Sequence, residues 1–473
     1  QSRGLGDVYK RQEEDSPEQH YTDTLTAACG LADPNAVWGM TQAASELVRS
    51  LHHLGVQFNV TDDDELDLRN FGGQKKKRTA FAQSDTGKQL MTALIDAVRR
   101  EESAGTVERF PHHKFRTLLL SGNICGGCTV QDTYTGELLR FVCDAVLIAT
   151  GGLHGLFGDT TGSLANTGEV TAELFRLGVP MANLEMIQYH PTTVELGEKR
   201  MLLSEAARGE GGRLFALRNG KPWYFMEEKY PELGNLMPRD ITAREVWTVS
   251  RDYEVFLDMT ELPKEVMEHK LAGLVDDCQT YLHKDIRKEP IPILPGIHYF
   301  MGGIQVDERH RTSMRNLYAA GECCAQYHGA NRLGGNSLLG AIYGGQIAAE
   351  TACRETVSSP NMPCAEESLL PELSPDAQMQ MNRILLNALG VVRDAQTLEA
   401  GIQEIRKLSG TLPLLGCAML ESAFARKESR GAHWRADYPQ RNDAVYCKTT
   451  VAHWNGQHIA ISFESIPERR HDL

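Results

Sequence analysis

Two short apolar runs, each ending at a glycine, constrain the fold of this chain more than any other feature of its sequence. Ala145-Val-Leu-Ile-Ala149 is followed by Thr-Gly151-Gly152, and Asn316-Leu-Tyr-Ala-Ala320 is followed by Gly321. A continuous apolar run of this length is typical of a strand buried inside a parallel sheet. Glycine directly after the strand lets the backbone turn sharply and approach a flat ligand. The two junctions therefore predict an α/β fold that binds a dinucleotide.

Helical segments and a further glycine pair bear on this prediction. Apolar side chains recur with helical spacing over 40–54, which Gly55 closes, and again over 87–100. No G-x-G-x-x-G motif occurs in the chain, and this absence alone would argue against a dinucleotide site. However, Gly334-Gly335 lies just before a helix expected over 337–351. The N-terminus of such a helix offers free N–H groups and a positive dipole end to an anionic ligand.

Composition excludes several other classes of protein. The chain has 473 residues, with 49 Lys and Arg against 63 Asp and Glu, which gives a formal net charge of −14. Because an acidic surface repels phosphate backbones, no nucleic-acid partner is expected. No apolar stretch approaches the ~20 residues that cross a bilayer, so no direct membrane span is expected.

Cysteines and clustered basic residues receive structural interpretations. Eleven cysteines without a repeating interval favour a reduced compartment over a disulfide framework. The motif Cys125-Gly-Gly-Cys128 has no second pair and no His at zinc spacing. It is therefore interpreted as a structural turn, and no metal site is predicted. The basic run 75–78 is interpreted as a solvated loop.

Six strings, spread in order along the chain, carry a family resemblance. They are QYHPTT (188–193), LSEAARGEGG (203–212), PRDITAR (238–244), HYFMGG (298–303), GANRLGGNS (329–337) and ESRGAH (428–433). Together they resemble the flavoprotein subunit of succinate dehydrogenase and fumarate reductase, in a superfamily that also contains the L-aspartate oxidases. No single string is specific for the family. The six together, in the same order and within a match from about residue 13 to 443, are specific.

The resemblance implies a fold class and a division into domains. We expect an α/β, Rossmann-like FAD-binding domain over 13–185 and 299–353, with an inserted α+β capping domain over 186–298. A linker over 354–376, a C-terminal helical domain over 377–436 and an irregular tail over 437–473 should follow. Residues 1–12 (QSRGLGDVYKRQ) are interpreted as a non-native segment. The first βαβ unit of the family, which holds the ADP moiety of FAD, is expected to be absent, as in an N-terminally truncated chain.

The resemblance also implies a substrate site for a C4 dicarboxylate. The residues implied to hold its two carboxylates are His190, Ser204, His298 and Arg332. Arg239 is implied to transfer the proton to or from the substrate carbon, with Glu205 and Arg208 linking it to solvent. Because arginine ordinarily stays protonated, this role depends on the nearby carboxylate of Glu205. The alternative is that Arg239-Asp240 is an ion pair at the start of a helix.

For the cofactor, the resemblance points to a set of residues along both halves of the expected FAD domain. They are Gly151, Gly152, Glu169, Glu322, Ser337 and Leu338. Glu169 and Ser204 stand where the dehydrogenases usually carry Asp and Thr, and serine keeps the hydroxyl group. Aspartate oxidases usually read Ala-Ser where Gly334-Gly335 stands, so the sequence favours dicarboxylate redox chemistry over oxidation of an amino acid.

The sequence thus predicts an FAD-dependent oxidoreductase that interconverts fumarate and succinate. Hydride would move to or from flavin N5, and Arg239 would move the proton. Two alternatives stay open: an L-aspartate oxidase, and an inactive fragment or assembly subunit that lacks FAD. The resemblance also implies an iron–sulfur electron-transfer subunit as a further partner. The expected location is the cytoplasm, or the cytoplasmic face of a membrane through partner subunits.

Overall fold

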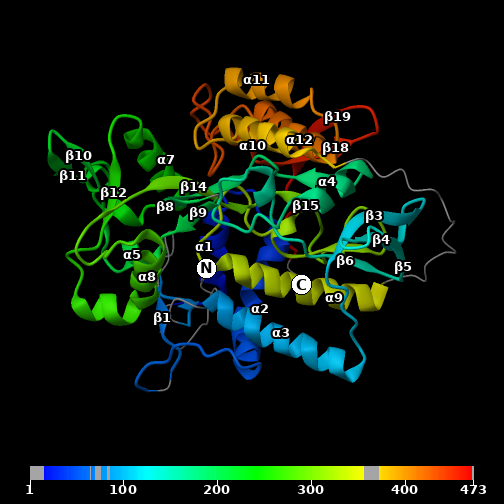
Figure 1. Cartoon of the computed structure of the whole chain (residues 1–473), viewed down its shortest axis with the longest axis horizontal. Coiled ribbons are helices and arrows are strands. Elements are labelled where there is room, and N and C mark those ends of the chain that lie inside the picture. The colour runs from blue at the N-terminus through cyan, green and yellow to red at the C-terminus, as the bar shows by residue number, and fades with distance from the viewer. Residues whose placement is uncertain are drawn as a thin grey trace.

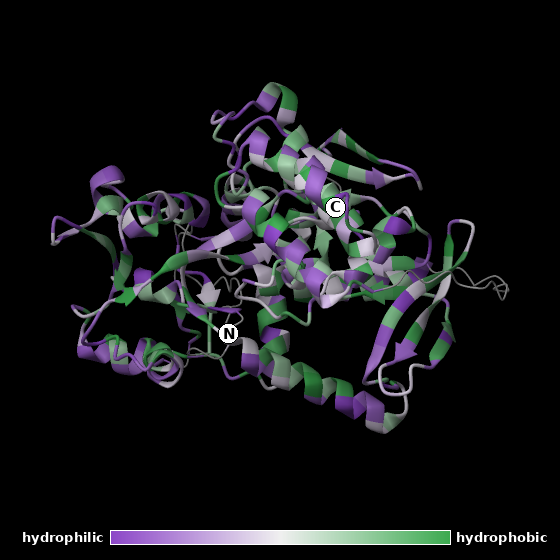
Figure 2. Ribbon diagram, turned by 45° about the horizontal axis from the view of Figure 1, so that its top comes forward, coloured by the Kyte–Doolittle hydropathy of each residue, from purple (hydrophilic) through white to green (hydrophobic). Residues whose placement is uncertain are grey.

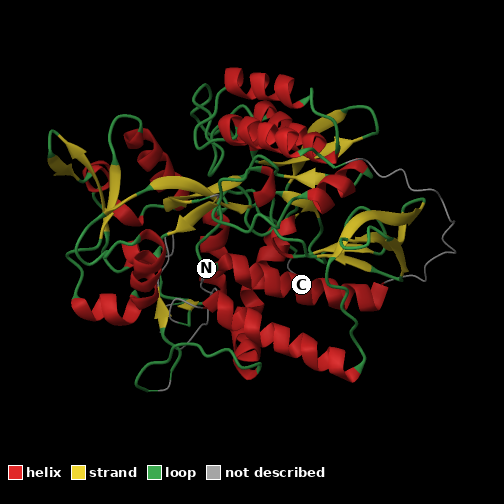
Figure 3. Cartoon of the chain, in the orientation of Figure 1, coloured by secondary structure: helices red, strands yellow, loops and turns green. Residues whose placement is uncertain are grey.

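The computed structural model of the chain describes residues 15–63, 65–69, 76–82, 86–197, 199–355 and 372–470. The segment 1–12, interpreted as non-native, and most of the expected linker 354–376 lie outside the described residues. Short strands occupy the middle of the molecule, with long helices below them and a second group of helices above (Figure 1, Figure 3). This mixed α/β architecture is the predicted fold class.

Four helices form the lower layer in Figure 1: α1 (Pro17–Ala27), α2 (Pro34–His53), α3 (Thr86–Ala104) and α9 (Asn336–Glu355). The side chain of Asp33 caps α2, because it accepts hydrogen bonds from the N–H groups of Asn35 and Ala36 at 2.8 and 3.3 Å. The apolar stripe of α2 packs against Leu339 of α9 and includes Met40, which is fully buried. The helix predicted over 40–54 is confirmed, and its start lies earlier, at Pro34.

The two predicted strand-to-glycine junctions lie side by side. Strand β6 (Val146–Ile148) pairs in parallel with β16 (Leu317–Ala319). Gly151 and Gly321 follow these strands with φ angles of 74° and 81°, in the left-handed region that favours glycine. The predicted burial is wrong for Leu147, which is 42% exposed because it faces away from the core.

A three-stranded antiparallel sheet, on the right of Figure 1, follows α3 in the chain. Its strands β3 (His113–Ser121), β4 (Ile124–Asp132) and β5 (Leu138–Val142) pair in that order. The turn expected at Cys125–Cys128 is wrong, since these residues lie within β4. Gly127 has no room for a side chain there, because a Cβ would lie 1.9 Å from the carbonyl oxygen of Phe141.

Residues 186–298 form the left part of Figure 1. One antiparallel sheet has the order β14 (Leu294–Phe300), β8 (Ile187–Leu196), β9 (Lys199–Leu202). A second has the order β11 (Lys221–Trp223), β10 (Arg213–Arg218), β12 (Val255–Asp258), β13 (Ile291–Pro292). The helices of this part are α5 (Ala206–Gly209), α6 (Phe225–Lys229), α7 (Arg239–Ser250) and α8 (Ala272–Asp277). It has an apolar core of its own around Leu214, Val246 and Leu257. The domain boundaries at 186 and 298 stay a prediction.

The C-terminal part covers the top of the molecule with α10 (Pro375–Ala388), α11 (Ala395–Ile405) and α12 (Thr411–Ala425). The tail expected to be irregular is instead a hairpin, β18 (Lys448–Trp454) and β19 (Ile459–Ser465), which follows the short helix α13 (Asp443–Tyr446). This hairpin completes a sheet in the order β17 (Cys324–Ala325), β15 (Gly303–Gln305), β7 (Met181–Ala182), β18, β19. Near its end the chain returns to α2, where the N–H of Arg470 donates to Asn35 Oδ1 at 2.8 Å.

One predicted loop residue is deeply buried. Arg78 precedes β2 (Thr79–Ala80), which pairs with β1 (Leu68–Arg69). Its side chain is fully buried, and its Nη2 lies 3.0 Å from Asp15 and 2.7 Å from Asp23 of α1. The interpretation of the basic run as solvated is therefore wrong for Arg78, because two carboxylates compensate its charge.

Polar residues interrupt the long helices (Figure 2). Among the helices within the described ranges, none is both long and apolar enough to span a bilayer.

Candidate active site

The three residues predicted to handle a proton form one buried, ion-paired chain. Glu205 precedes α5, and its Oε1 accepts a hydrogen bond from Arg208 Nη2 at 2.8 Å. Arg239 is the first residue of α7, and its Nη2 and Nε donate to Glu205 Oε2 at 2.5 and 3.0 Å. All three residues are at most 7% exposed. The carboxylate therefore lies between two guanidinium groups, with little solvent to screen the charges.

The electrostatics of this chain follow from burial and charge together. Burial alone would raise the pKa of Glu205, but the guanidinium groups of Arg239 and Arg208 outweigh it and hold that pKa well below 4.5. Burial lowers the pKa of His190 well below 6.5, and the charge of Arg239 lowers it further. At neutral pH, Glu205 is thus an anion and His190 is a neutral imidazole.

The two predicted substrate histidines lie on neighbouring strands. His190 belongs to β8 and His298 to β14, and their ring centroids are 5.2 Å apart in an edge-to-face arrangement. His298 Nδ1 lies 2.8 Å from the hydroxyl of Thr161. The Nε2 atom of His190 is buried and has no hydrogen-bond partner among the described residues. Ser204, one residue before Glu205, is half-buried, and its hydroxyl accepts from the N–H of Ala206 at 3.3 Å.

Arg332 is held in the loop between β17 and α9. It is 3% exposed, and its guanidinium carbon lies 4.4 Å from the ring centroid of Tyr299, next to His298 on β14. Gln188 connects it to the proton chain: its Nε2 donates to the carbonyl oxygen of Arg332 at 2.9 Å, and its Oε1 accepts from Arg239 Nη1 at 3.1 Å. Sequence reasoning missed Gln188, although it opens the string QYHPTT that was singled out.

Residues around the two glycine junctions and the start of α9 test whether the site suits FAD. At Gly152 a Cβ would lie 2.7 Å from Glu322 Oε1, and at Gly151 it would lie 2.6 Å from the amide nitrogen of Asn166. We call the space around Gly151 and Gly152, bounded by Asn166 and Glu322, the glycine cradle; any side chain at these two positions would fill it. Ser337, in the first turn of α9, has a buried hydroxyl without a partner among the described residues. Glycines without room for a side chain, a carboxylate and a buried hydroxyl at a helix N-terminus fit a flavin nucleotide.

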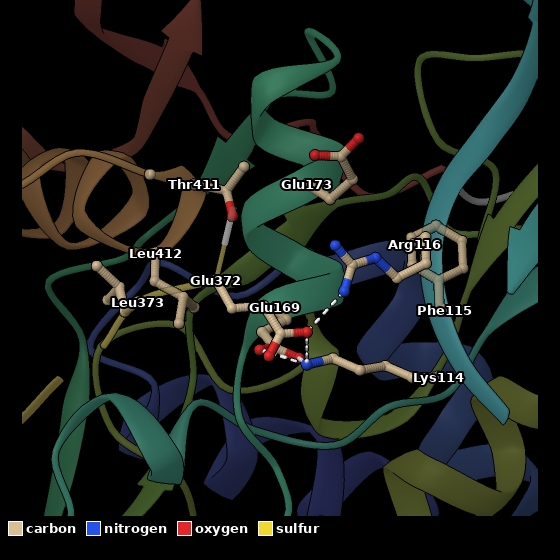
Figure 4. A pocket seen from close by; sticks show the side chains of 10 residues that line it. Lys114, Phe115, Arg116, Glu169, Glu173, Glu372, Leu373, Thr411 and Leu412 are labelled. Carbon is tan, nitrogen blue, oxygen red and sulfur yellow. Dashed lines mark hydrogen bonds and ion pairs between the residues drawn. The ribbon is translucent and has the colours of Figure 1, made fainter. Parts of the chain in front are cut away.

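The remaining predicted cofactor residues lie in other surroundings. Glu169 begins α4 (Glu169–Arg176), and its carboxylate pairs with Lys114 of β3 at 2.9 Å. The carboxylate of Glu372 pairs with Lys114 at 2.8 Å and with Arg116 at 2.6 Å. These residues line a pocket of about 50 Å³ (Figure 4). Leu338 packs against an apolar cluster with Val48 of α2. The roles of Glu169 and Leu338 toward FAD stay predictions.

Comparisons with known proteins agree with this arrangement. The chain matches the FAD binding domain family over residues 2–338 and the fumarate reductase flavoprotein C-terminal family over 409–470. It is 37% identical to the succinate dehydrogenase flavoprotein subunit of Bacillus subtilis, over 97% of this chain and 88% of that protein. It is also 30% identical to the L-aspartate oxidase of Streptomyces coelicolor, over 96% of this chain and 85% of that protein.

A solved structure shows the same likeness. The FrdA chain of E. coli quinol fumarate reductase superposes with a TM-score of 0.87 at 25% identity, covering 98% of this chain and 89% of that one. The glycine cradle, the free hydroxyl at α9 and the family matches lead to the same conclusion about the cofactor. The chain belongs to the succinate dehydrogenase and fumarate reductase flavoprotein family, whose members are FAD-dependent oxidoreductases.

Proposed function

We propose that this protein interconverts fumarate and succinate. The observation that carries the proposal is the buried chain Arg239–Glu205–Arg208, which starts beside two histidines and an arginine able to bind a dianion. Bound FAD would supply or accept the hydride. The residues of the chain then have three tasks: to hold both carboxylates, to exclude water, and to move one proton.

His190 would donate a hydrogen bond to a substrate carboxylate. Its Nδ1 lies 3.3 Å from the N–H of Thr192 and 3.2 Å from the carbonyl oxygen of the same residue, so Thr192 holds the ring in place. The buried Nε2, which has no partner among the described residues, is the nitrogen that would carry the proton of the neutral imidazole and donate it to the carboxylate. His298 and the hydroxyl of Ser204 would add further single hydrogen bonds. Arg332 would bind the other carboxylate through its planar fork, which the ring of Tyr299 orients.

Arg239 would deliver the proton in fumarate reduction and receive it in succinate oxidation. An arginine can take this role only if its deprotonated form is short-lived, so a group that can relay a proton to it must be in contact with it. Glu205 Oε2, 2.5 Å from Nη2, provides that contact, and Arg208 extends it on the other side of the carboxylate. Arg208 Nη1 donates to the carbonyl oxygen of Asn235 at 2.7 Å, which keeps the end of the chain in place.

A second candidate function is oxidation of L-aspartate, favoured by the 30% identity to an L-aspartate oxidase over nearly the whole chain. L-aspartate is also a C4 dicarboxylate, and the same carboxylate-binding residues would hold it. Arg239 would then act on the carbon that bears the amine.

For partners and location, we propose an iron–sulfur subunit as the electron carrier and attachment to the cytoplasmic face of a membrane through further subunits. The support is the likeness to the FrdA chain of quinol fumarate reductase.

An anaerobic titration tests the proposed function. Fumarate is added to FAD-loaded protein that has been reduced by two electrons, and succinate or L-aspartate is added to the oxidised protein, while the flavin absorbance is followed. Fumarate should reoxidise the reduced protein, and succinate should reduce the oxidised one. If only L-aspartate reduces the flavin, the second candidate is correct. If none of the three changes the oxidation state, both proposals are wrong.

A further inference from the structure

Helix α7, which begins at Arg239, has little of its own to fix its start. The residue before it is Pro238, and no side chain caps the first turn. The position of the Arg239 guanidinium, 2.5 Å from Glu205, therefore depends on contacts that α7 makes with other parts of the fold. Two such contacts come from segments that follow it by many residues in the chain.

The first contact joins α7 to the loop of the predicted substrate anchor. Asp240, the second residue of α7, accepts a hydrogen bond from Asn331 Nδ2 at 3.1 Å, and Asn331 directly precedes Arg332. Asn331 is 5% exposed, and its Oδ1 accepts from Gln188 Nε2 at 2.9 Å. This contact fixes the first turn of α7 relative to the substrate loop.

The second contact joins α7 to the C-terminal part. Arg244 lies one turn after Asp240, and its guanidinium carbon is 3.8 Å from the ring centroid of Trp434. This is within the distance at which a cation is attracted to the face of an indole. Trp434 belongs to a segment outside the predicted capping domain, so the stack connects two parts of the chain that have separate apolar cores.

The backbone that carries Trp434 is firmly anchored on both sides. The rings and charges of its neighbours His433 and Arg435 are completely buried. His433 Nδ1 accepts from Arg393 Nη1 at 2.8 Å, and Arg435 Nη1 donates to the carbonyl oxygen of Ala423 at 2.9 Å. The indole is thus a rigid platform, and the helix is the part whose position it can set.

We propose that the stack of Arg244 on Trp434, which we name the α7 clamp, positions Arg239 for proton transfer. Both clamp residues are positioning residues, because neither touches the proton chain itself. The clamp would act along the helix: Arg244 fixes one turn, and the turn before it carries Arg239 and Asp240. The proposal rests on the proposed function only for its effect on turnover, since the position of α7 can be measured without substrate.

The test uses substitutions that keep an apolar side chain but remove the aromatic face or the charge. In FAD-loaded protein, Trp434→Leu and Arg244→Met should each lower kcat for fumarate reduction by about 3- to 30-fold, the range that the loss of one cation–π contact allows. The dissociation constant for malonate, a non-reactive dicarboxylate, should change less than about 2-fold, because the carboxylate-binding residues remain. Trp434→Tyr, which keeps an aromatic face, should restore most of kcat. The double variant should be no slower than Arg244→Met, because both substitutions remove the same stack and Arg244 alone also interacts with Asp240 and Tyr230.

A matched control and a second readout separate the clamp from a general loss of structure. Arg251 follows α7 and lies over Trp247 at 5.2 Å, in an exposed position, so Arg251→Met removes a similar pair from the other end of the helix. Hydrogen exchange of the backbone amides in the first two turns of α7, without substrate, should quicken in Trp434→Leu and not in Arg251→Met.

The outcomes distinguish the two proposals. If the wild type lacks turnover but hydrogen exchange responds as described, the proposed function is wrong and the clamp stands. If exchange and kcat are unchanged in Trp434→Leu, or change equally in Arg251→Met, the clamp is wrong. A parallel loss of malonate binding would also overturn it, since the clamp would then support the whole site and not the position of Arg239.

Discussion

Replacing Arg239 by Gln is the most direct test of the proton chain. The substitution removes three hydrogen bonds, two to Glu205 Oε2 and one to Gln188 Oε1, together with the positive charge. A positioned acid or base contributes about 10²- to 10⁴-fold to turnover, which corresponds to ~3 to 6 kcal/mol of barrier at ~1.4 kcal/mol per tenfold. Substrate binding should change much less, because His190 and Arg332 remain to hold the carboxylates.

The same substitution also affects stability, so the assay must separate the two effects. Removing one partner of a buried ion pair typically costs about 3–5 kcal/mol. Here Glu205 keeps Arg208 at 2.8 Å, so we expect a loss at or below the lower end of that range, measured by urea unfolding.

Turnover should be measured below the unfolding transition, at matched FAD content, with fumarate and a reduced dye. The flavin spectrum should still respond to malonate in Arg239→Gln, which shows that the site binds a dianion. Arg251→Gln, an exposed arginine just after α7, is the control and should keep wild-type turnover. If Arg239→Gln retains turnover near that of the wild type, the residue is only a structural ion pair and the proposed mechanism is refuted.

Three further predictions concern binding, the cofactor and pH. Arg332→Ala should raise KM for fumarate by about 10- to 100-fold, because a bidentate pair with a carboxylate is lost; an unchanged KM would exclude Arg332 from the site. Gly151→Ala should reduce the FAD retained through gel filtration, since a Cβ would lie 2.6 Å from Asn166; full retention would contradict the cradle. Burial and then the charge of Arg332 lower the pKa of His328 to about 3, so below pH 6.5 only the unfolded chain binds a proton there. Between pH 6.5 and 4, this histidine should make the free energy of unfolding fall by about 1.4 kcal/mol per pH unit, and His328→Gln should remove that part of the slope; an unaltered slope would show that His328 is protonated in the native state.

The sequence predicted best those features that local patterns determine. The parallel strands β6 and β16 were predicted from two continuous apolar runs, and helix α2 from apolar residues that recur at helical spacing. Predictions failed where the surroundings of a residue depend on residues that are distant in the sequence. Nothing in the sequence near Arg78 shows that Asp15, just before α1, and Asp23, within α1, compensate its charge. The hairpin β18–β19 did carry a local signal that was overlooked, because Asn455-Gly456 lies between alternating runs and is typical of a tight turn.

In the candidate site, too, some features could be predicted from the sequence and others could not. Family strings indicated which residues to examine, and the structure shows Arg239 and Arg208 in contact with Glu205. The strings could not show that Gln188 spans from Arg239 to the carbonyl of Arg332, because hydrogen bonds between separate segments depend on the packing of β8 against the substrate loop.

The return of the chain end to α2 has a consequence for biosynthesis. Asn35 and Arg470 are 435 positions apart, and the carbonyl of Glu468 also accepts from Asn35 Nδ2, at 3.2 Å. Similarly, Arg430 donates to the carbonyl of Cys29 at 2.7 Å. While the ribosome is still translating, the nascent chain must hold these early segments without their final partners. The early helices therefore stay without these contacts until residue 470 has been synthesised, and contacts of such large sequence separation are typical of folds with high contact order, which form slowly.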